Sequence, residues 1–158
     1  MSDNLTHTQR RRCMKKNMGR DTKLELKLRR ALWQRGLRYR LNAKIVGRPD
    51  LVFLKKRIAV FVDGCFWHGC SRHFRAPATN REFWLTKIEN NRNRDMRVDC
   101  ELREKGWNVV RFWEHDLNEN LDYCVQIVVS TYEATTPVQR MLDKIPPESD
   151  PEDPLRRC

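Results

Sequence analysis

Two cysteines and two histidines are spaced so that they could bind a single zinc ion; they are Cys65, Cys70, His73 and, far downstream, His115. Thiolate sulfur and imidazole nitrogen are common ligands of tetrahedral Zn²⁺. Four protein ligands close the coordination shell, which indicates a structural site rather than a catalytic one. The spacing differs from the usual zinc-finger pattern, and the alternative is that Cys65 and Cys70 are ordinary buried thiols.

His68 lies between the two cysteines and could act as a general base on water, because imidazole exchanges a proton near neutral pH. A histidine base needs an acceptor at its other ring nitrogen, and Asp95 is the candidate for this role. Asp95 falls in a predicted long helix on the same face as Trp84, about three turns earlier. The alternative is that His68 is a spare zinc ligand and Asp95 a surface partner of Arg94 or Arg97.

Asp50 follows a Gly-Arg-Pro turn at the start of an apolar run, where a carboxylate could bind Mg²⁺. The apolar runs 50–54 and 58–62 flank three basic residues and are predicted to form an antiparallel hairpin. If the last residue of the first run pairs near the first residue of the second, Asp50 lies opposite Val62 or Asp63. The group offered there is a backbone carbonyl or a second carboxylate, an arrangement that suits metal-assisted phosphodiester hydrolysis. The alternative for Pro-Asp is turn formation.

Three aromatic residues accompany these groups: Phe66 and Trp67 are adjacent in the cysteine-containing run, and Trp84 lies near the start of the long helix. Adjacent aromatics in a polar loop can act as wedges between base pairs. The alternative, that they belong to the core, is favoured by composition alone. Glu25 is the fourth residue of a capping-box pattern that begins at Thr22. Helix capping is therefore sufficient to explain why a glutamate occupies this position.

The apolar periodicity predicts the elements that would position these residues. Helices are expected over about 22–36, 79–105 (opened by a second capping-box pattern) and 119–133, and strands over 37–41, 50–54, 58–62 and 107–113. One domain is therefore expected over 21–133, after a basic arm at 1–20. The tail 134–158 holds five of the seven prolines and is expected to be disordered.

The charge of the chain favours a polyanionic partner, although a solvated basic surface is the alternative. The formal net charge is +11, and because the tail 134–158 has five acidic and four basic residues, the rest of the chain carries +12. No apolar run approaches the roughly 20 residues of a membrane span, and the N-terminus lacks the apolar stretch of a signal peptide. We therefore expect a cytoplasmic protein with reduced thiols and no membrane association.

Taken in order, the motifs resemble those of the very short patch repair endonucleases, over about residues 16–117. The matching segments are Asn17-Met18, Arg20-Asp21-Thr22, Gly47-Arg48-Pro49-Asp50, Gly64-Cys65-Phe66-Trp67-His68, Pro77-Ala78-Thr79, Glu82-Phe83-Trp84, Lys87-Ile88, Arg94-Asp95 and Trp113-Glu114.

The resemblance implies an α/β fold of the restriction-endonuclease type, in which a mixed β-sheet core is flanked by helices and one structural zinc site is present. It also implies a DNA mismatch endonuclease that uses Mg²⁺ to nick duplex DNA 5′ of the thymine in a T·G mismatch left by deamination of 5-methylcytosine. The expected partner is double-stranded DNA at the bacterial nucleoid, with mismatch-repair proteins of the MutL type as further candidates. A mismatch is asymmetric and the sequence has no heptad pattern, so a monomer is expected.

The resemblance also assigns roles to individual residues. The catalytic residues implied are Asp50, His68 as the general base, Asp95 as its supporting carboxylate, and Glu25. The Mg²⁺ ligands implied are Asp50 and the backbone carbonyl of Val62, with Asp63 left open as a further ligand or a structural residue. The intercalating residues implied are Phe66, Trp67 and Trp84.

Two competing functions remain at this point. A zinc-stabilised DNA-binding module without catalysis predicts binding but no cleavage, and the presence of Asp50, His68 and Asp95 disfavours it. A restriction-type nuclease without a mismatch requirement predicts equal cleavage of matched and mismatched duplexes.

Overall fold

The computed structural model describes residues 6, 8, 9 and 21–135. The predictions of a basic arm at 1–20 and of a disordered tail at 134–158 therefore lie almost entirely outside the described residues. None of the helices in the described part of the chain combines the length and the apolar composition that crossing a membrane requires.

A three-stranded mixed sheet forms the centre of the fold, in the order β1 (Leu51–Phe53), β2 (Ile58–Asp63), β3 (Asn108–Trp113). Strands β1 and β2 are antiparallel and are joined by the short 3-10 helix η1 (Leu54–Lys56). Strands β2 and β3 are parallel, and the crossover between them contains the long helix α3 (Arg81–Glu104). The expected mixed α/β architecture is confirmed.

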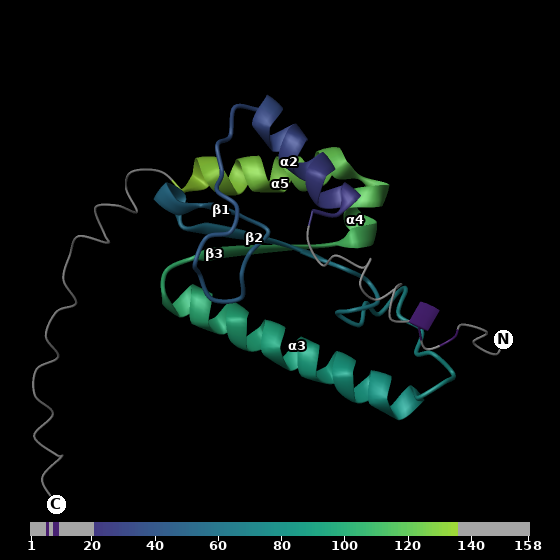
Figure 1. The fold of residues 1–158 in the computed structure, drawn as a ribbon. Coiled ribbons are helices and arrows are strands. Elements are labelled where there is room, and N and C mark those ends of the chain that lie inside the picture. The colour runs from purple at the N-terminus through teal and green to yellow at the C-terminus, as the bar shows by residue number, and fades with distance from the viewer. Residues whose placement is uncertain (1–5, 7, 10–20, 136–158) are drawn as a thin grey trace, which may run out of the picture.

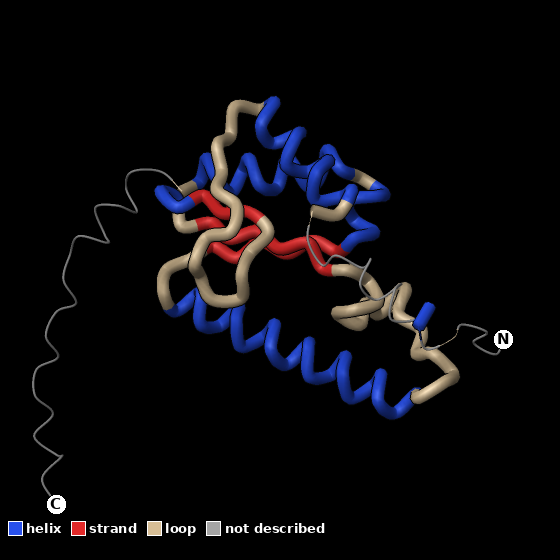
Figure 2. The backbone as a smooth tube through the Cα atoms, in the orientation of Figure 1, coloured by secondary structure: helices blue, strands red, loops and turns tan. Residues whose placement is uncertain are grey.

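Helices cover both faces of the sheet (Figure 1). Helix α3 crosses one face, while α2 (Lys23–Gln34), α4 (Glu114–Glu119) and α5 (Leu121–Ala134) lie against the other. The loop between β2 and α3 extends beyond the edge of the sheet towards the N-terminal end of α3 (Figure 2). The residues of the cysteine-containing run lie in this loop, 64–80.

Alternate residues of β2 point to opposite faces of the sheet, as the strand period requires. Ile58 and Val60 pack into the core under α2, α4 and α5, whereas Ala59 and Phe61 pack towards α3. The first core also includes Leu28, Leu32, Phe112, Leu117, Val125 and Val128. The second also includes Val52, Val98 and Leu102. Burying one such aliphatic side chain contributes about 1.5–3 kcal/mol, so the two cores hold the sheet rigidly between its helices.

The hairpin register differs from the prediction by one residue. Phe53 pairs with Ile58, so continuing the register places Asp50 opposite Phe61 and not opposite Val62 or Asp63. The reason is that Leu54 leaves the strand to begin η1, which ends at Arg57 in the left-handed conformation with φ 49°.

Two other local predictions were wrong. The segment 37–41 forms only a single bridge, between Arg40 and Val52, instead of a strand. The expected capping box at 79–82 does not form, because Asn80 adopts a left-handed conformation and makes no side-chain cap hydrogen bond. The last predicted helix, 119–133, is confirmed as α5, which Asn120 caps by accepting from the Tyr123 N–H at 3.0 Å; the short helix α4 that precedes it was not predicted.

Candidate active site

Asp50 is fixed to the edge of the hairpin by three hydrogen bonds. Its backbone N–H donates to the Val60 carbonyl at 3.0 Å, and its Oδ2 accepts from the Val62 N–H at 2.7 Å. The guanidinium of Arg29 donates to its carbonyl at 3.3 Å. Burial, followed by the nearby carboxylates Glu25 and Asp63, raises the pKa of Asp50 to about 6, although the Val62 hydrogen bond and the charge of Arg29 lower it. A cation beside this carboxylate would offset that unfavourable charge.

Glu25 connects the start of α2 to the same region. Only half of the first expected capping box forms: Thr22 accepts from the Glu25 N–H at 3.3 Å, whereas the Glu25 carboxylate accepts from the Thr22 hydroxyl and from the N–H of Asp21, each at 2.9 Å, and not from the N–H of Thr22. The same carboxylate pairs with Arg29 at 3.0 Å, and Glu25 is only 4% exposed. Through Arg29, which also pairs with Asp21, this buried acid is linked to the backbone of Asp50. Sequence reasoning missed Arg29.

His68 lies in the loop after β2, and the structure brings it against Asp95 of α3. Its Nδ1 lies 2.5 Å from Oδ2 of Asp95 and 3.6 Å from Oδ1 of Asp63. An ionised carboxylate can only accept, so this contact places a proton on Nδ1, and in the neutral imidazole Nε2 is then the acceptor. The loop can approach α3 because Gly69 has φ +65°, and a Cβ there would lie 2.5 Å from a methyl carbon of Ile88.

Arg111 of β3 is the central cation beside His68, and it too was missed from the sequence. Its Nε and one terminal nitrogen bond the two oxygens of Asp63 at 2.7 and 2.9 Å, and its other terminal nitrogen bonds Asp99 at 2.7 Å. Its guanidinium also lies 3.7 Å from Asp95 and over the ring of Phe61. Although burial lowers it, the pKa of Arg111 is raised by the hydrogen bonds and charge of Asp63, so it is fully cationic.

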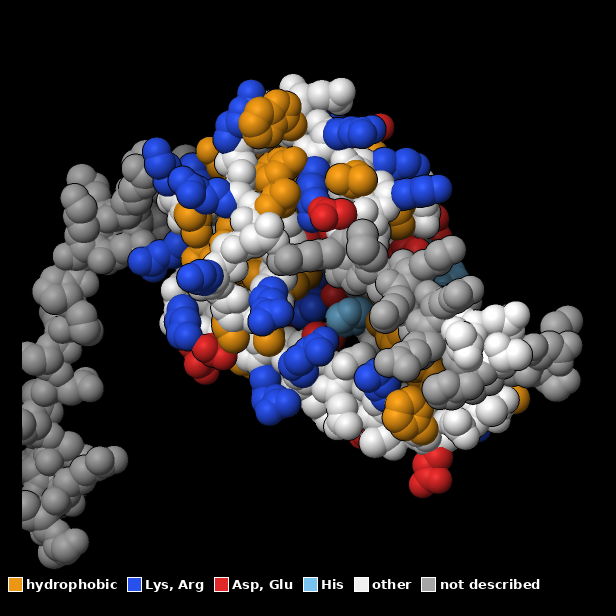
Figure 3. All heavy atoms as spheres, viewed as in Figure 1, with side chains coloured by type: hydrophobic (Ala, Val, Ile, Leu, Met, Phe, Trp, Pro, Cys, Tyr) orange, Lys and Arg blue, Asp and Glu red, His pale blue; other side chains and the backbone are white. Residues whose placement is uncertain are grey.

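These groups surround a small cavity of about 150 Å³, which Asp50, Val62, His68 and Arg111 all line. A second cavity of about 380 Å³ extends along α3 and shares four lining residues with the first: Asp63, His68, Asp95 and Arg111. Figure 3 shows the hollow, with histidine and acidic side chains within it and lysine and arginine side chains around it. Two exposed arginines, Arg48 and Arg94, are among the residues that line the smaller cavity.

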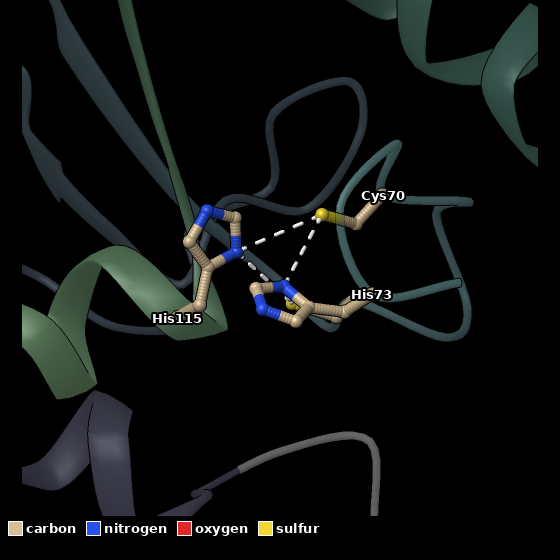
Figure 4. A group of neighbouring side chains, drawn as sticks. Cys70, His73 and His115 are labelled. Carbon is tan, nitrogen blue, oxygen red and sulfur yellow. Dashed lines mark hydrogen bonds between the residues drawn. The ribbon is translucent and has the colours of Figure 1, made fainter. Parts of the chain in front are cut away.

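The four expected metal ligands meet in one cluster, where their ligating atoms all lie within 4.8 Å of one another. Sγ of Cys65 lies 3.2 Å from Nδ1 of His115 and 3.8 Å from Nδ1 of His73. Sγ of Cys70 lies 3.7 Å from each of the same two nitrogens (Figure 4). Ligands about 2.0–2.3 Å from a tetrahedral zinc ion are separated by roughly 3.5 Å, so the cluster could hold such an ion.

The cluster joins segments that are distant in sequence. His115 is in the first turn of α4, directly after β3, whereas its partners come from the loop after β2. On its outer side, Nε2 of His115 lies 3.3 Å from Asp116, the kind of contact that orients a metal-binding imidazole. Burial, together with the adjacent Cys70, raises the pKa of Cys65, so a cation is needed for both sulfurs to be thiolates.

The three aromatics that were singled out form one cluster beside this loop. The ring centroid of Phe66 lies 5.2 Å from that of Trp67 and 5.3 Å from that of Trp84. The backbone carbonyl of Trp67 accepts from the Asn91 side chain at 2.8 Å, which ties the loop to α3. All three rings are only partly buried, so the packing that supports them leaves part of their surface free for a partner.

Comparisons with known proteins agree on one family. A family model described as DNA mismatch endonuclease Vsr matches residues 2–73. The chain is 48% identical over 129 residues to the type II nicking enzyme V.NmeDIP of Neisseria meningitidis serogroup C, covering 80% of this chain and 87% of the relative. It is 45% identical over 138 residues to the type II nicking enzyme V.HpaIIP of Haemophilus parainfluenzae, covering 83% and 96%. It is 44% identical over 97 residues to the DNA mismatch endonuclease Vsr of Escherichia coli K12, covering 60% and 62%.

Proposed function

The chain belongs to the Vsr family of DNA mismatch endonucleases and is a DNA endonuclease, and we propose that it uses Mg²⁺ to nick duplex DNA 5′ of the thymine in a T·G mismatch. The observation that carries the proposal is the meeting of Asp50 and His68 at one small cavity. Asp50 is a desolvated carboxylate that can bind a cation, and His68 is an imidazole oriented to accept a proton.

Asp50 and the backbone carbonyl of Val62 are the proposed Mg²⁺ ligands. The fit rests on the raised pKa of Asp50, to which burial contributes first and neighbouring carboxylates add, because a bound cation relieves both effects. When bound, Mg²⁺ supplies charge neutralisation at the phosphate and the leaving oxygen. Glu25 acts in this proposal as a positioning residue, since it holds Arg29 against the Asp50 carbonyl.

His68 is the proposed general base. Asp95 keeps the proton on Nδ1, so Nε2 can take a proton from the water that attacks the phosphorus. In this proposal the exposed arginines Arg48 and Arg94, which line the smaller cavity, bind backbone phosphates near the cut and so position the strand without reading its sequence.

Phe66, Trp67 and Trp84 are the proposed wedge at the mismatch. A mismatched pair is more weakly stacked and paired than a matched one, so opening the duplex there costs less. A partly exposed aromatic cluster in and near the loop that carries His68 would therefore select the mismatch as well as bind it. The partner in this proposal is double-stranded DNA containing a T·G pair, with proteins of the MutL type as further partners.

A structural zinc ion is proposed for the cluster Cys65, Cys70, His73 and His115. It would fasten the loop that carries Trp67 and His68 to the end of β3. The mixed sheet with helices on both faces supports a restriction-endonuclease-type domain over 21–133, and we propose that it acts as a monomer in the bacterial cytoplasm.

The test is strand nicking of an end-labelled duplex carrying one T·G mismatch in varied flanking contexts, with Mg²⁺. A matched T·A duplex and the Asp50→Ala variant serve as controls. A nick 5′ of the mismatched thymine that is absent from both controls is the expected result. Equal cutting of both duplexes would indicate a restriction-type nuclease, and binding without cutting in any context would indicate a DNA-binding module.

A further inference from the structure

Asp63 is a buried carboxylate with both oxygens already occupied. It is 7% exposed, and Arg111 bonds its two oxygens at 2.7 and 2.9 Å in the paired geometry that matches a guanidinium to a carboxylate. A metal ligand at this position would have to give up one of these charge-assisted hydrogen bonds. The geometry therefore favours Asp63 as the partner of an arginine and not as a ligand of Mg²⁺.

The guanidinium of Arg111 contacts both carboxylates that lie around His68, those of Asp63 and Asp95. Oδ1 of Asp63 lies 3.6 Å from Nδ1 of His68, just beyond hydrogen-bonding distance, so a small movement would let it compete with Asp95 for the proton on that nitrogen. Arg111 holds Asp63 by two hydrogen bonds and lies 3.7 Å from Asp95. It thereby offsets the repulsion between two carboxylates that face one imidazole.

We propose that Arg111 is a positioning residue. It holds the Asp63 carboxylate away from His68, so that the Nδ1–H of His68 donates its hydrogen bond to Asp95 alone. The inference rests on the proposed role of His68 as general base. Without Arg111, the freed Asp63 carboxylate would pull the imidazole away from Asp95 and turn its Nε2 away from the attacking water. The nicking step would slow, while contacts with DNA elsewhere would remain.

A purely structural role is the competing explanation, because Arg111 also joins β3 to α3 through Asp99 at 2.7 Å. Both explanations predict a lower melting temperature when Arg111 is replaced. Only the positioning role predicts that the loss of rate is caused by Asp63, and that removing the Asp63 charge repairs it.

The experiment compares Arg111→Met with the double variant Arg111→Met/Asp63→Asn. Single-turnover nicking of the T·G duplex and equilibrium binding are both measured in full-length protein. Arg111→Met should lower the nicking rate by about 10- to 100-fold, the usual cost of losing a group that orients a site, with duplex affinity nearly unchanged. The double variant should recover most of that rate. A double variant no faster than Arg111→Met alone would overturn the proposal.

Two further variants keep the test decisive. Asp99→Asn removes an Arg111 ion pair that involves neither Asp63 nor His68, and should lower stability while changing the rate by no more than about twofold. Asp63→Asn alone should leave the half-saturating Mg²⁺ concentration unchanged, whereas a rise of about tenfold would make Asp63 a metal ligand, against the proposal. If Arg111→Met does not fold, Arg111→Lys takes its place, because lysine keeps the charge but cannot bond both Asp63 oxygens in the same way.

The failure of this inference is distinct from failure of the proposed function. Wild-type protein that does not nick the T·G duplex contradicts the function itself. Wild-type protein that nicks, beside a folded Arg111→Met variant that nicks equally fast, contradicts only the role of Arg111.

Discussion

The two halves of the site are held in place in different ways. Asp50 is bonded to the backbone of the neighbouring strand through its own N–H and its carboxylate, so the sheet itself positions it. His68 belongs to a loop, and side chains from α3 and β3 position it through Asp95 and the Asp63–Arg111 pair. The first half depends on local backbone pairing, and the second depends on long-range contacts and on the Cys/His cluster.

Each half contains one mostly buried arginine that balances its acids. Arg29 joins Glu25 to the carbonyl of Asp50, and within the described residues its Nε is buried without a hydrogen-bond partner. Arg111 has every nitrogen of its guanidinium engaged with Asp63 or Asp99. A buried ion pair is costly to break from one side. Substitutions in the Asp50 half should therefore act mainly through metal binding. Substitutions in the His68 half should act through the geometry of the loop and through proton transfer.

The largest effect is expected for Asp50→Ala. Removing the proposed metal ligand should lower the nicking rate by about 10⁴-fold, because metal assistance is worth several kcal/mol. Binding to the mismatched duplex should be largely kept, and can be measured by fluorescence anisotropy in the same buffer. Nicking at the wild-type rate would remove Asp50 from the mechanism.

His68→Ala should have the next largest effect, at least about 100-fold on the single-turnover rate. The half-saturating Mg²⁺ concentration should stay near the wild-type value, because the metal site belongs to the other half. A large shift in the Mg²⁺ requirement would show that the two halves are not separable in this way.

Replacing His115 tests whether the metal cluster supports the His68 half. His115→Ala should release the proposed zinc and lower the melting temperature by about 10 °C or more, as the loss of a few kcal/mol does in a domain of this size. Metal content measured by mass spectrometry gives the second readout. A fully stable variant that keeps its metal would contradict the assignment.

Trp67→Ala should act on selectivity more than on binding. Stacking of an aromatic on a base is worth about 1–3 kcal/mol, so the preference for T·G over T·A should fall by roughly tenfold or more. Affinity for a matched duplex, measured in parallel, should fall less. Equal losses on the two duplexes would place Trp67 in the core and not at the DNA.

The smallest effect concerns Asp50 and pH. Burial raises the pKa of Asp50 to about 6 in the folded chain, from the ordinary 3.8. Its contribution to stability is therefore complete below about pH 4 and is lost as pH rises through about 6. In Mg²⁺-free buffer, Asp50→Asn should melt a few degrees above wild type at pH 8, with the difference vanishing near pH 4. Equal melting temperatures at pH 8 would contradict the raised value.

The sheet strands and the residues of the Cys/His cluster were accessible from sequence because they rest on local patterns. Apolar runs predicted β2 and β3, and ligand chemistry selected the four residues of the Cys/His cluster that the structure brings together. The hairpin register was displaced by one residue because sequence alone did not reveal that Leu54 begins a 3-10 turn. The capping box predicted at 79–82 failed for a similar reason, because the sequence pattern did not reveal that the backbone of Asn80 adopts the left-handed conformation.

The Arg111 network was not predicted because it depends on which strands become neighbours. Arg111 lies in β3, and its Asp63 partner lies in β2, so only the parallel pairing of these strands brings the two side chains together. A signal was nevertheless present: an arginine stands within an otherwise apolar strand, and an aspartate ends another. An isolated charge of this kind in a buried strand needs a partner, and pairing the two would have identified the link.

The most direct test of a single site built from two halves is a kinetic cycle of Asp50→Ala, His68→Ala and the double variant, by single-turnover nicking of the T·G duplex. If both residues act on one phosphate in one step, the double variant should be about as slow as the slower single variant, because groups that act as a unit lose their effect together. Rate losses that multiply fully in the double variant would contradict that conclusion and would show that the two halves act independently.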